Sequence, residues 1–164
     1  MILVGIGSNL AAPPAETPLQ TAVAALDALP NVGIDIERCS KWYLSEPVPA
    51  SDQPWFVNGV VAVASTLTPA ALLERLLAVE RDFARVRSVP NAARTLDLDL
   101  LDYESRIRET TNLILPHPRL HLRRFVLEPL CEIAPDWPHP TLGLTARDLL
   151  ARLPPGQPVR RIDD

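Results

Sequence analysis

The chain of 164 residues is 47% hydrophobic, which suits one domain with a substantial core and leaves too little length for two. Its formal net charge of -4 gives no overall positive field to hold nucleic acid, and no stretch is apolar for long enough to span a membrane. We therefore expect a single domain over residues 1–164 that binds neither nucleic acid nor a membrane.

The apolar opening, residues 1–6, predicts a first β-strand. It lacks a basic flank and ends too soon for a secretory signal, so we expect a cytoplasmic protein. Cys39 and Cys131 lie far apart and form no Cys-x-x-Cys pair, which is typical of a reduced intracellular protein with buried thiols.

Two helix starts carry capping signals. Thr17-Pro18-Leu19-Gln20 supplies an N-cap, a proline at the first position and a capping-box partner, and this helix should end at residues 29–31. Thr68-Pro69 repeats the signal, and the apolar residues between 72 and 83 then recur at helical spacing.

Strand-like patterns occupy residues 34–37, 55–65 and 96–101, with a proline-rich loop between the first two. The resulting order β-α-β-β-α-β predicts an α+β fold, a ferredoxin-like split β-α-β arrangement with helices on one face of an antiparallel sheet. Beyond it we expect a short extended piece at 113–115, a helix-like run at 125–133 and a capped helix at 145–153.

The most informative stretch is Arg94-Thr95-Leu96-Asp97-Leu98-Asp99. On a strand, Asp97 and Asp99 leave the same face while the leucines between them face the core. Paired carboxylates suit magnesium, which takes one or two of them together with substrate phosphates. Taken alone, however, such a pattern is more often the solvated face of an antiparallel sheet.

Arginines and one carboxylate flank this pair. Arg94 precedes Asp97, and Arg85 and Arg87 lie upstream, where they either help neutralise a polyphosphate or are ordinary surface residues. Glu80 extends the apolar stripe of its helix and should point at least partly inward, toward an arginine or a ligand.

Phe56 and Asn58 share a strand face, which sets an aromatic ring beside an amide that can donate and accept. The pair suits a flat heterocycle, although, taken alone, a core phenylalanine with a backbone-bonded asparagine is slightly the more common arrangement. His117 lies between two prolines and could contact a phosphate. No glycine-rich nucleotide loop is present, so phosphates must be held in another way.

These motifs in this order resemble 6-hydroxymethyl-7,8-dihydropterin pyrophosphokinases. The resemblance covers nearly the whole chain and rests on five strings: Gly7-Ser8-Asn9-Leu10, Asp52-Gln53-Pro54-Trp55-Phe56-Val57-Asn58, Glu80 with Arg85, Arg94-Thr95-Leu96-Asp97-Leu98-Asp99, and Pro116-His117-Pro118-Arg119-Leu120 followed by Arg123-Arg124-Phe125.

The resemblance implies a magnesium-dependent, cytoplasmic enzyme of folate biosynthesis, expected to be monomeric, that moves pyrophosphate from ATP to a pterin. It implies two magnesium ions on Asp97 and Asp99, with Arg85 and Arg94 also catalytic. It places ATP against Glu80, Arg85, Arg87, Arg94, His117 and Arg123, and the pterin against Ser45, Val48, Phe56, Asn58 and Phe125.

The sequence departs from the family pattern in the loop before Arg94. Residues 90–93 lack the tryptophan and glycine that are usual there, in a loop that closes over the substrates in the family. Two other readings compete: a regulatory paralogue that binds a pterin or nucleotide without catalysis, and a small RNA-binding domain of the same fold. The acidic balance and the Asp97/Asp99 pair argue against RNA.

Overall fold

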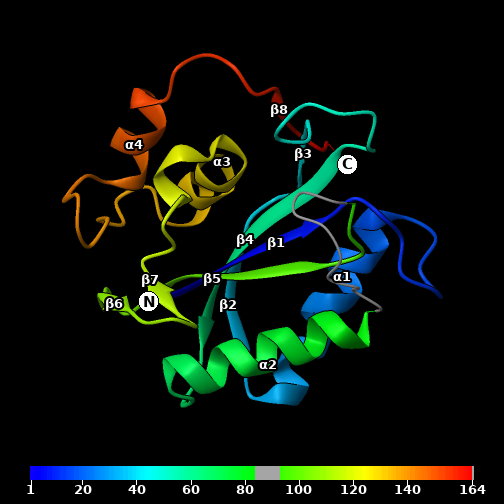
Figure 1. The fold of residues 1–164 in the computed structure, drawn as a ribbon, viewed down its shortest axis with the longest axis horizontal. Coiled ribbons are helices and arrows are strands. Elements are labelled where there is room, and N and C mark those ends of the chain that lie inside the picture. The colour runs from blue at the N-terminus through cyan, green and yellow to red at the C-terminus, as the bar shows by residue number, and fades with distance from the viewer. Residues whose placement is uncertain (84–92, 164) are drawn as a thin grey trace.

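A computed structural model describes residues 1–83 and 93–163 of the chain (Figure 1). Within these residues one antiparallel sheet has the strand order β5-β1-β4-β3-β8, and β2 also pairs with β4. Its strands are β1 Ile2–Ser8, β2 Asp35–Cys39, β3 Tyr43–Ser45, β4 Phe56–Ala64, β5 Asp97–Tyr103 and β8 Val159–Arg161. The predicted α+β class and split β-α-β core are confirmed, because β5, β1, β4 and β2 lie in the order that this fold requires.

The two predicted helix starts are confirmed by their caps. Helix α1, Pro18–Ala28, begins at Thr17, whose hydroxyl accepts from the Gln20 N–H at 3.1 Å while the Gln20 side chain accepts from the Thr17 N–H at 3.2 Å. Helix α2, Pro69–Asp82, begins at Thr68, whose hydroxyl accepts from the Ala71 N–H at 3.3 Å. A 3-10 turn, Leu29–Val32, follows α1 and ends at Gly33, whose positive φ suits glycine.

The expectation that helices cover one face holds for α1 and α2 only. These two pack beneath the sheet in Figure 1, whereas α3, Arg124–Ile133, and α4, Ala146–Arg152, lie on the opposite side. Alternation along the strands produces this result: Val4, Ile6 and Leu98 join the core under α1 and α2, while Leu3 and Leu101 join a second core with α3. The sheet is therefore buried on both faces.

Several short elements differ from the predictions. Strand β3 lies inside the stretch expected to be loop, and β8 was not anticipated, because both are only three residues long and depend on pairing for their form. The structure also contains a two-stranded ribbon, formed by β6 Arg108–Glu109 and β7 Ile114–Leu115, and a 3-10 turn at Leu120–Leu122. The prediction of two buried cysteines is wrong for Cys39, which is exposed, and Cys131 is only partly buried.

Across the described residues, every helix is too short or too polar to traverse a lipid bilayer.

Candidate active site

A cavity of roughly 280 Å³ lies between the sheet and the start of α3. Its lining unites nine residues that the sequence singled out: Ser45, Val48, Phe56, Asn58, Arg94, Asp97, Asp99, Arg123 and Phe125. It also includes Arg119 from the Pro116–Leu120 string, and three side chains that the sequence did not indicate, namely Glu46, Leu122 and Gln157. Residues from six separate parts of the chain, with β1 as one of them, thus meet at one site.

The floor of the cavity is the pleated face of β1. In the antiparallel register Gly7 pairs with Asn58 on one side and with Asp97 on the other. A Cβ atom on Gly7 would lie 3.6 Å from the Asn58 Oδ1 atom and 3.8 Å from the Asp97 Cβ atom. Glycine at this position therefore leaves open the space between the amide and the carboxylate.

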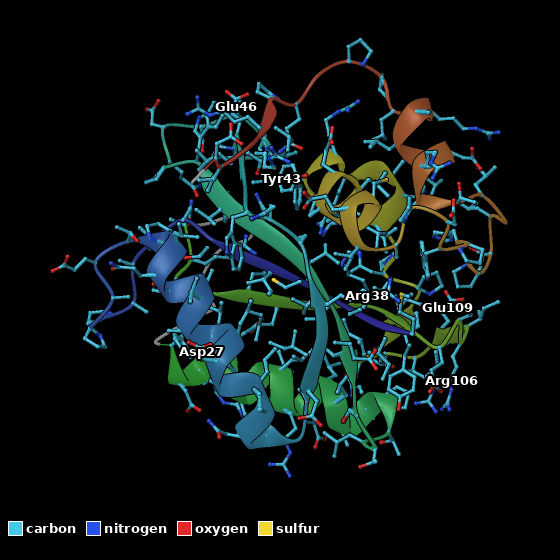
Figure 2. The ribbon with its side chains drawn as sticks, turned by 180° about the vertical axis from the view of Figure 1, so that it is seen from behind. Asp27, Arg38, Tyr43, Glu46, Arg106 and Glu109 are labelled. Carbon is cyan, nitrogen blue, oxygen red and sulfur yellow. The ribbon has the colours of Figure 1, made fainter. Side chains whose placement is uncertain are left out.

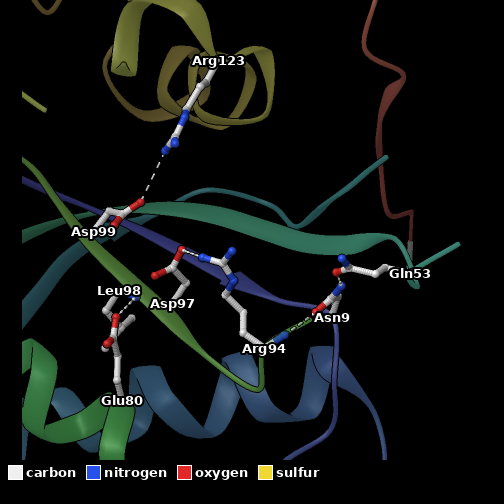
Figure 3. A network of polar contacts seen from close by, with 8 residues as sticks. All are labelled: Asn9, Gln53, Glu80, Arg94, Asp97, Leu98, Asp99 and Arg123. Atoms are coloured by element: carbon white, nitrogen blue, oxygen red, sulfur yellow. Dashed lines mark hydrogen bonds and ion pairs between the residues drawn. The ribbon is translucent and has the colours of Figure 1, made fainter. Parts of the chain in front are cut away.

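Asp97 and Asp99 leave the same face of β5 and line the cavity together, as the alternation predicted (Figure 3). Leu96, Leu98 and Leu100 occupy the opposite core and are no more than 4% exposed. The carboxylates are thus fixed side by side by strand geometry, because the buried leucines prevent the strand from rotating.

Each carboxylate faces an arginine. The Arg94 guanidinium donates to Asp97 Oδ2 at 2.8 Å, and an Arg123 nitrogen lies 3.6 Å from Asp99 Oδ2. All four side chains are between 21% and 34% exposed, so the pairs are screened by water only in part and remain reachable by a ligand. If a polyphosphate entered here, its oxygens could replace the carboxylate oxygens as acceptors of the guanidinium N–H groups.

The donor set also fits a hard cation. Among the described residues no group of three or more histidine, cysteine or acidic side chains could hold a metal ion alone. Two parallel carboxylates that line a cavity supply the part of a magnesium shell that proteins usually provide, the rest coming from water and substrate phosphates. Asp97 and Asp99 are therefore suitable ligands once a phosphate is present.

Asn9, from the Gly7-Ser8-Asn9-Leu10 turn, holds three segments together. Its Oδ1 atom accepts from the Arg94 N–H at 2.8 Å, and its amide nitrogen donates to the Pro54 carbonyl at 3.0 Å and to Gln53 Oε1 at 3.3 Å. The Arg94 guanidinium then lies over the Phe56 ring, 5.7 Å from its centre. Figure 3 shows the contacts of Asn9 with Gln53 and with Arg94. Asn9 thus fixes the arginine that stacks on the Phe56 ring.

The orientation of the Asn58 amide is set by its donor side. Its nitrogen donates to the Ser45 hydroxyl at 2.7 Å and to the Phe56 carbonyl at 3.3 Å, and both Asn58 and Ser45 are less than 5% exposed. The remaining acceptor, Oδ1, faces the space above Gly7. Phe125 provides a second ring, with the Arg123 guanidinium 5.5 Å from its centre.

Glu80 and His117 are the two predicted ATP contacts that, among the described residues, do not line the cavity. Glu80 is 2% exposed and accepts from the Leu98 N–H at 2.8 Å, on the side of β5 away from the aspartates (Figure 3). It points inward as expected, and its contact with a nucleotide stays a prediction. Arg85, Arg87 and residues 88–92 of the altered loop lie outside the described residues.

His117 stands near the positive part of the cavity. Burial, followed by the charges of Arg123 and Arg119, lowers its pKa to about 4, while Asp97 acts in the opposite direction. Its Nδ1 atom accepts from the Arg119 N–H at 3.1 Å, which leaves the proton of the neutral ring on Nε2. His117 can therefore donate to an anionic oxygen at neutral pH without being a cation beforehand.

We expect the His117 ring to titrate at about 4 in the ligand-free protein, as measured by the pH dependence of its NMR ring-proton shifts. The unfolded chain protonates this histidine near 6.5, so between the two values the unfolded state binds more protons. Its contribution to stability is full above pH 6.5 and is lost as the pH falls toward 4. A His117→Gln variant should lose this resonance and part of the acid-side drop in unfolding free energy. A His117 midpoint near 6.5 would contradict the assignment.

The chain is similar to known proteins over most of its length. A family model described as 7,8-dihydro-6-hydroxymethylpterin-pyrophosphokinase (HPPK) matches residues 3–135. A 2-amino-4-hydroxy-6-hydroxymethyldihydropteridine pyrophosphokinase from Synechocystis is 43% identical over 92% of this chain and 75% of its own length. Proteins with the same name from Pseudomonas aeruginosa and Methylorubrum extorquens are 39% and 41% identical over 93% of the chain, covering 91% and 92% of their lengths.

Solved structures agree in fold. Plasmodium falciparum HPPK-DHPS, wild type with pteroate, superposes with a TM-score of 0.66 at 12% identity. The match covers 92% of this chain and 42% of that longer chain. At this identity the likeness establishes the architecture of the sheet and helices alone.

Proposed function

Since the chain belongs to the 7,8-dihydro-6-hydroxymethylpterin-pyrophosphokinase family, we propose that it transfers the terminal pyrophosphate of ATP to the hydroxymethyl group of 6-hydroxymethyl-7,8-dihydropterin, a step of folate biosynthesis. One observation carries the proposal: a single cavity is lined both by an aromatic and amide set and by two carboxylates with their arginines. A flat, hydrogen-bonding ring and a polyphosphate are the two ligand types that such a lining fits.

The heterocycle is expected against Phe56 and Phe125. Both rings line the cavity and offer apolar area to a planar ligand. The Oδ1 atom of Asn58 accepts from a ring N–H or amine, and the segment of Ser45 and Val48 borders the same ligand edge. Because Asn58 and Ser45 are buried and bonded to one another, this part of the pocket is already shaped for its ligand.

The triphosphate is expected beside Arg94, Arg123 and His117. The guanidinium groups present planar donors to phosphate oxygens, and the neutral imidazole adds an N–H donor. Two magnesium ions would be held by Asp97 and Asp99; when bound, they would neutralise phosphate charge and polarise the phosphoryl group. Contacts of the nucleotide with Glu80, Arg85 and Arg87 complete the proposed set.

Transfer proceeds by attack of the pterin hydroxymethyl oxygen on the β-phosphorus of ATP, and the hydroxyl proton is released to solvent as the new O–P bond forms. The bond from that phosphorus to the oxygen bridging the α and β positions breaks, and AMP leaves with this oxygen. The chain contributes by aligning the two substrates and by placing Arg94 and Arg123 where charge accumulates on the transferred oxygens. No covalent enzyme intermediate is involved.

The alternative function is a regulatory paralogue that binds a pterin or nucleotide without transfer. The joint retention of Asp97, Asp99, Arg94 and Arg123 around one cavity favours the enzyme, because a module that only binds a pterin has no use for paired carboxylates opposite arginines. The single-domain organisation, monomeric state and cytoplasmic location expected from the sequence stay predictions.

The test is an assay of AMP release. AMP should form from ATP only when both magnesium and the hydroxymethyl pterin are present, and mass spectrometry should find the pterin heavier by a diphosphate. Omission of the pterin or chelation of magnesium serves as the control. Tight pterin binding with no AMP under any of these conditions would favour the regulatory paralogue.

A further inference from the structure

Strand β8 borders the site and lies outside the residues that the family model matches. The family model covers residues 3–135, whereas β8 comprises Val159–Arg161. Strand β8 pairs with β3 in antiparallel register, Ser45 opposite Val159 and Tyr43 opposite Arg161. Figure 2 shows the labelled Glu46 beside this last segment of the chain.

Two contacts tie the same backbone unit of the pocket to this segment. The Glu46 N–H donates to the Pro158 carbonyl at 3.3 Å, and the Gln157 amide nitrogen donates to the Glu46 carbonyl at 2.7 Å. The backbone N–H and the backbone carbonyl of Glu46 are therefore both hydrogen-bonded to residues 111 and 112 positions away, at the point where the chain leaves β3. The position of the backbone that leads to Val48 depends on them.

The far end of the same loop is held by the same strand. The loop runs from residue 46 to residue 55 and ends at Trp55, whose ring lies 5.8 Å from the guanidinium carbon of Arg160. Trp55 is 39% exposed, so its contact with Arg160 is a surface contact that restrains the ring without a core around it. Residues 157–160 thus hold both ends of the loop.

Gln157 also reaches the cavity itself, where it lies in the lining with Ser45, Glu46 and Val48. Its amide nitrogen is engaged with Glu46, so the amide oxygen is the group that it can present to an occupant. An acceptor at this wall complements ring N–H or amine donors, which a pterin carries on the edge opposite its hydroxymethyl group.

We propose that residues 157–160 form a specificity-determining wall of the heterocycle pocket: Gln157 fixes the loop at Glu46 and accepts from a donor of the bound ring, and Arg160 fixes the loop at Trp55. This inference rests on the proposed function for the identity of the ring. It implies that this segment sets the affinity for the heterocycle and leaves the affinity for ATP unchanged, because Asp97, Asp99 and their arginines are held by other elements.

The experiment compares Gln157→Ala and Arg160→Ala with the wild-type protein, and uses Arg161→Ala as the matched control. Arg161 belongs to the same strand but pairs with Asp163 and Glu132. Loss of one hydrogen bond to the ligand should raise the KM for the pterin roughly 5- to 10-fold in Gln157→Ala, with the KM for ATP unchanged. Arg160→Ala should raise the pterin KM by a smaller factor, and the control should match the wild type.

Hydrogen exchange of the ligand-free proteins gives a readout that does not depend on activity. The amides of Glu46 and Val48, which are the residues of 46–49 that are not proline, should exchange faster in Gln157→Ala than in the wild type, and the same amides in Arg161→Ala should not. A wild-type protein that forms no AMP would overturn the proposed function, while the exchange result would still decide the role of the wall. Unchanged pterin KM and unchanged exchange in Gln157→Ala, or an equal rise in both KM values, would overturn the inference itself.

Discussion

Replacement of Asp97 or Asp99 by asparagine should lower kcat by about 10³-fold or more, since each change removes one of the two carboxylates on which metal-assisted phosphoryl transfer would depend. Asparagine keeps the size and part of the hydrogen bonding of the side chain, so the loss reports on charge. Both residues line the cavity, and each lies within ion-pair distance of an arginine.

The same changes should hardly affect stability. The Arg94–Asp97 pair is 22% and 23% exposed, and an ion pair of this exposure contributes about 1 kcal/mol or less. Asp136→Asn is the matched control, because Asp136 also pairs with an arginine but is 81% exposed and does not line the cavity. Steady-state kinetics of the three variants measures kcat, and thermal unfolding measures the change in stability. An Asp97→Asn protein with near wild-type kcat would refute the metal assignment.

Replacement of Arg123 by alanine should lower kcat by about 10²- to 10³-fold, as expected for loss of one charged donor aimed at a developing phosphate charge. Arg123 immediately precedes α3, lies 3.6 Å from Asp99 and sits over the Phe125 ring, so it connects the phosphate side of the cavity with the aromatic side. Burial lowers its pKa and the Asp99 charge opposes that shift, and a guanidinium remains charged at neutral pH in either case.

Two further variants separate charge from geometry at this position. Arg123→Lys keeps the charge without the planar fork and should recover only part of the lost rate. Arg124→Ala is the neighbouring control, since Arg124 pairs with Glu128 along the helix surface and is absent from the cavity lining. Equal losses in Arg123→Ala and Arg124→Ala would mean that damage to the helix start, and not the guanidinium, accounts for the effect.

Much of the fold followed from local rules. The capping residues Thr17 and Thr68 determine where α1 and α2 begin, whatever the rest of the chain does, because their hydroxyl groups satisfy backbone donors a single turn away. The side-by-side placement of Asp97 and Asp99 is equally local, since alternate residues of any strand share a face. These features could be read correctly without knowledge of the tertiary structure.

Other features could not be read in this way. The helical pattern of 125–133 was recognised, but the face of the sheet that it covers depends on Leu3, Val60 and Leu101, which lie far away in sequence. Strand β3 is three residues within a proline-rich stretch, so its own sequence carries no strand pattern, and it is a strand because β4 and β8 lie on either side of it.

The sequence by itself determined the helix starts, the α+β class, the face shared by the two aspartates and the aromatic and amide pair Phe56 and Asn58. Only the tertiary structure decided that Gln157 stands in the same cavity, beside a residue 111 positions earlier in the chain. The physical reason is the range of the forces involved: caps and alternation act within a few residues, whereas strand pairing and core packing bring together groups whose separation along the chain leaves no local pattern.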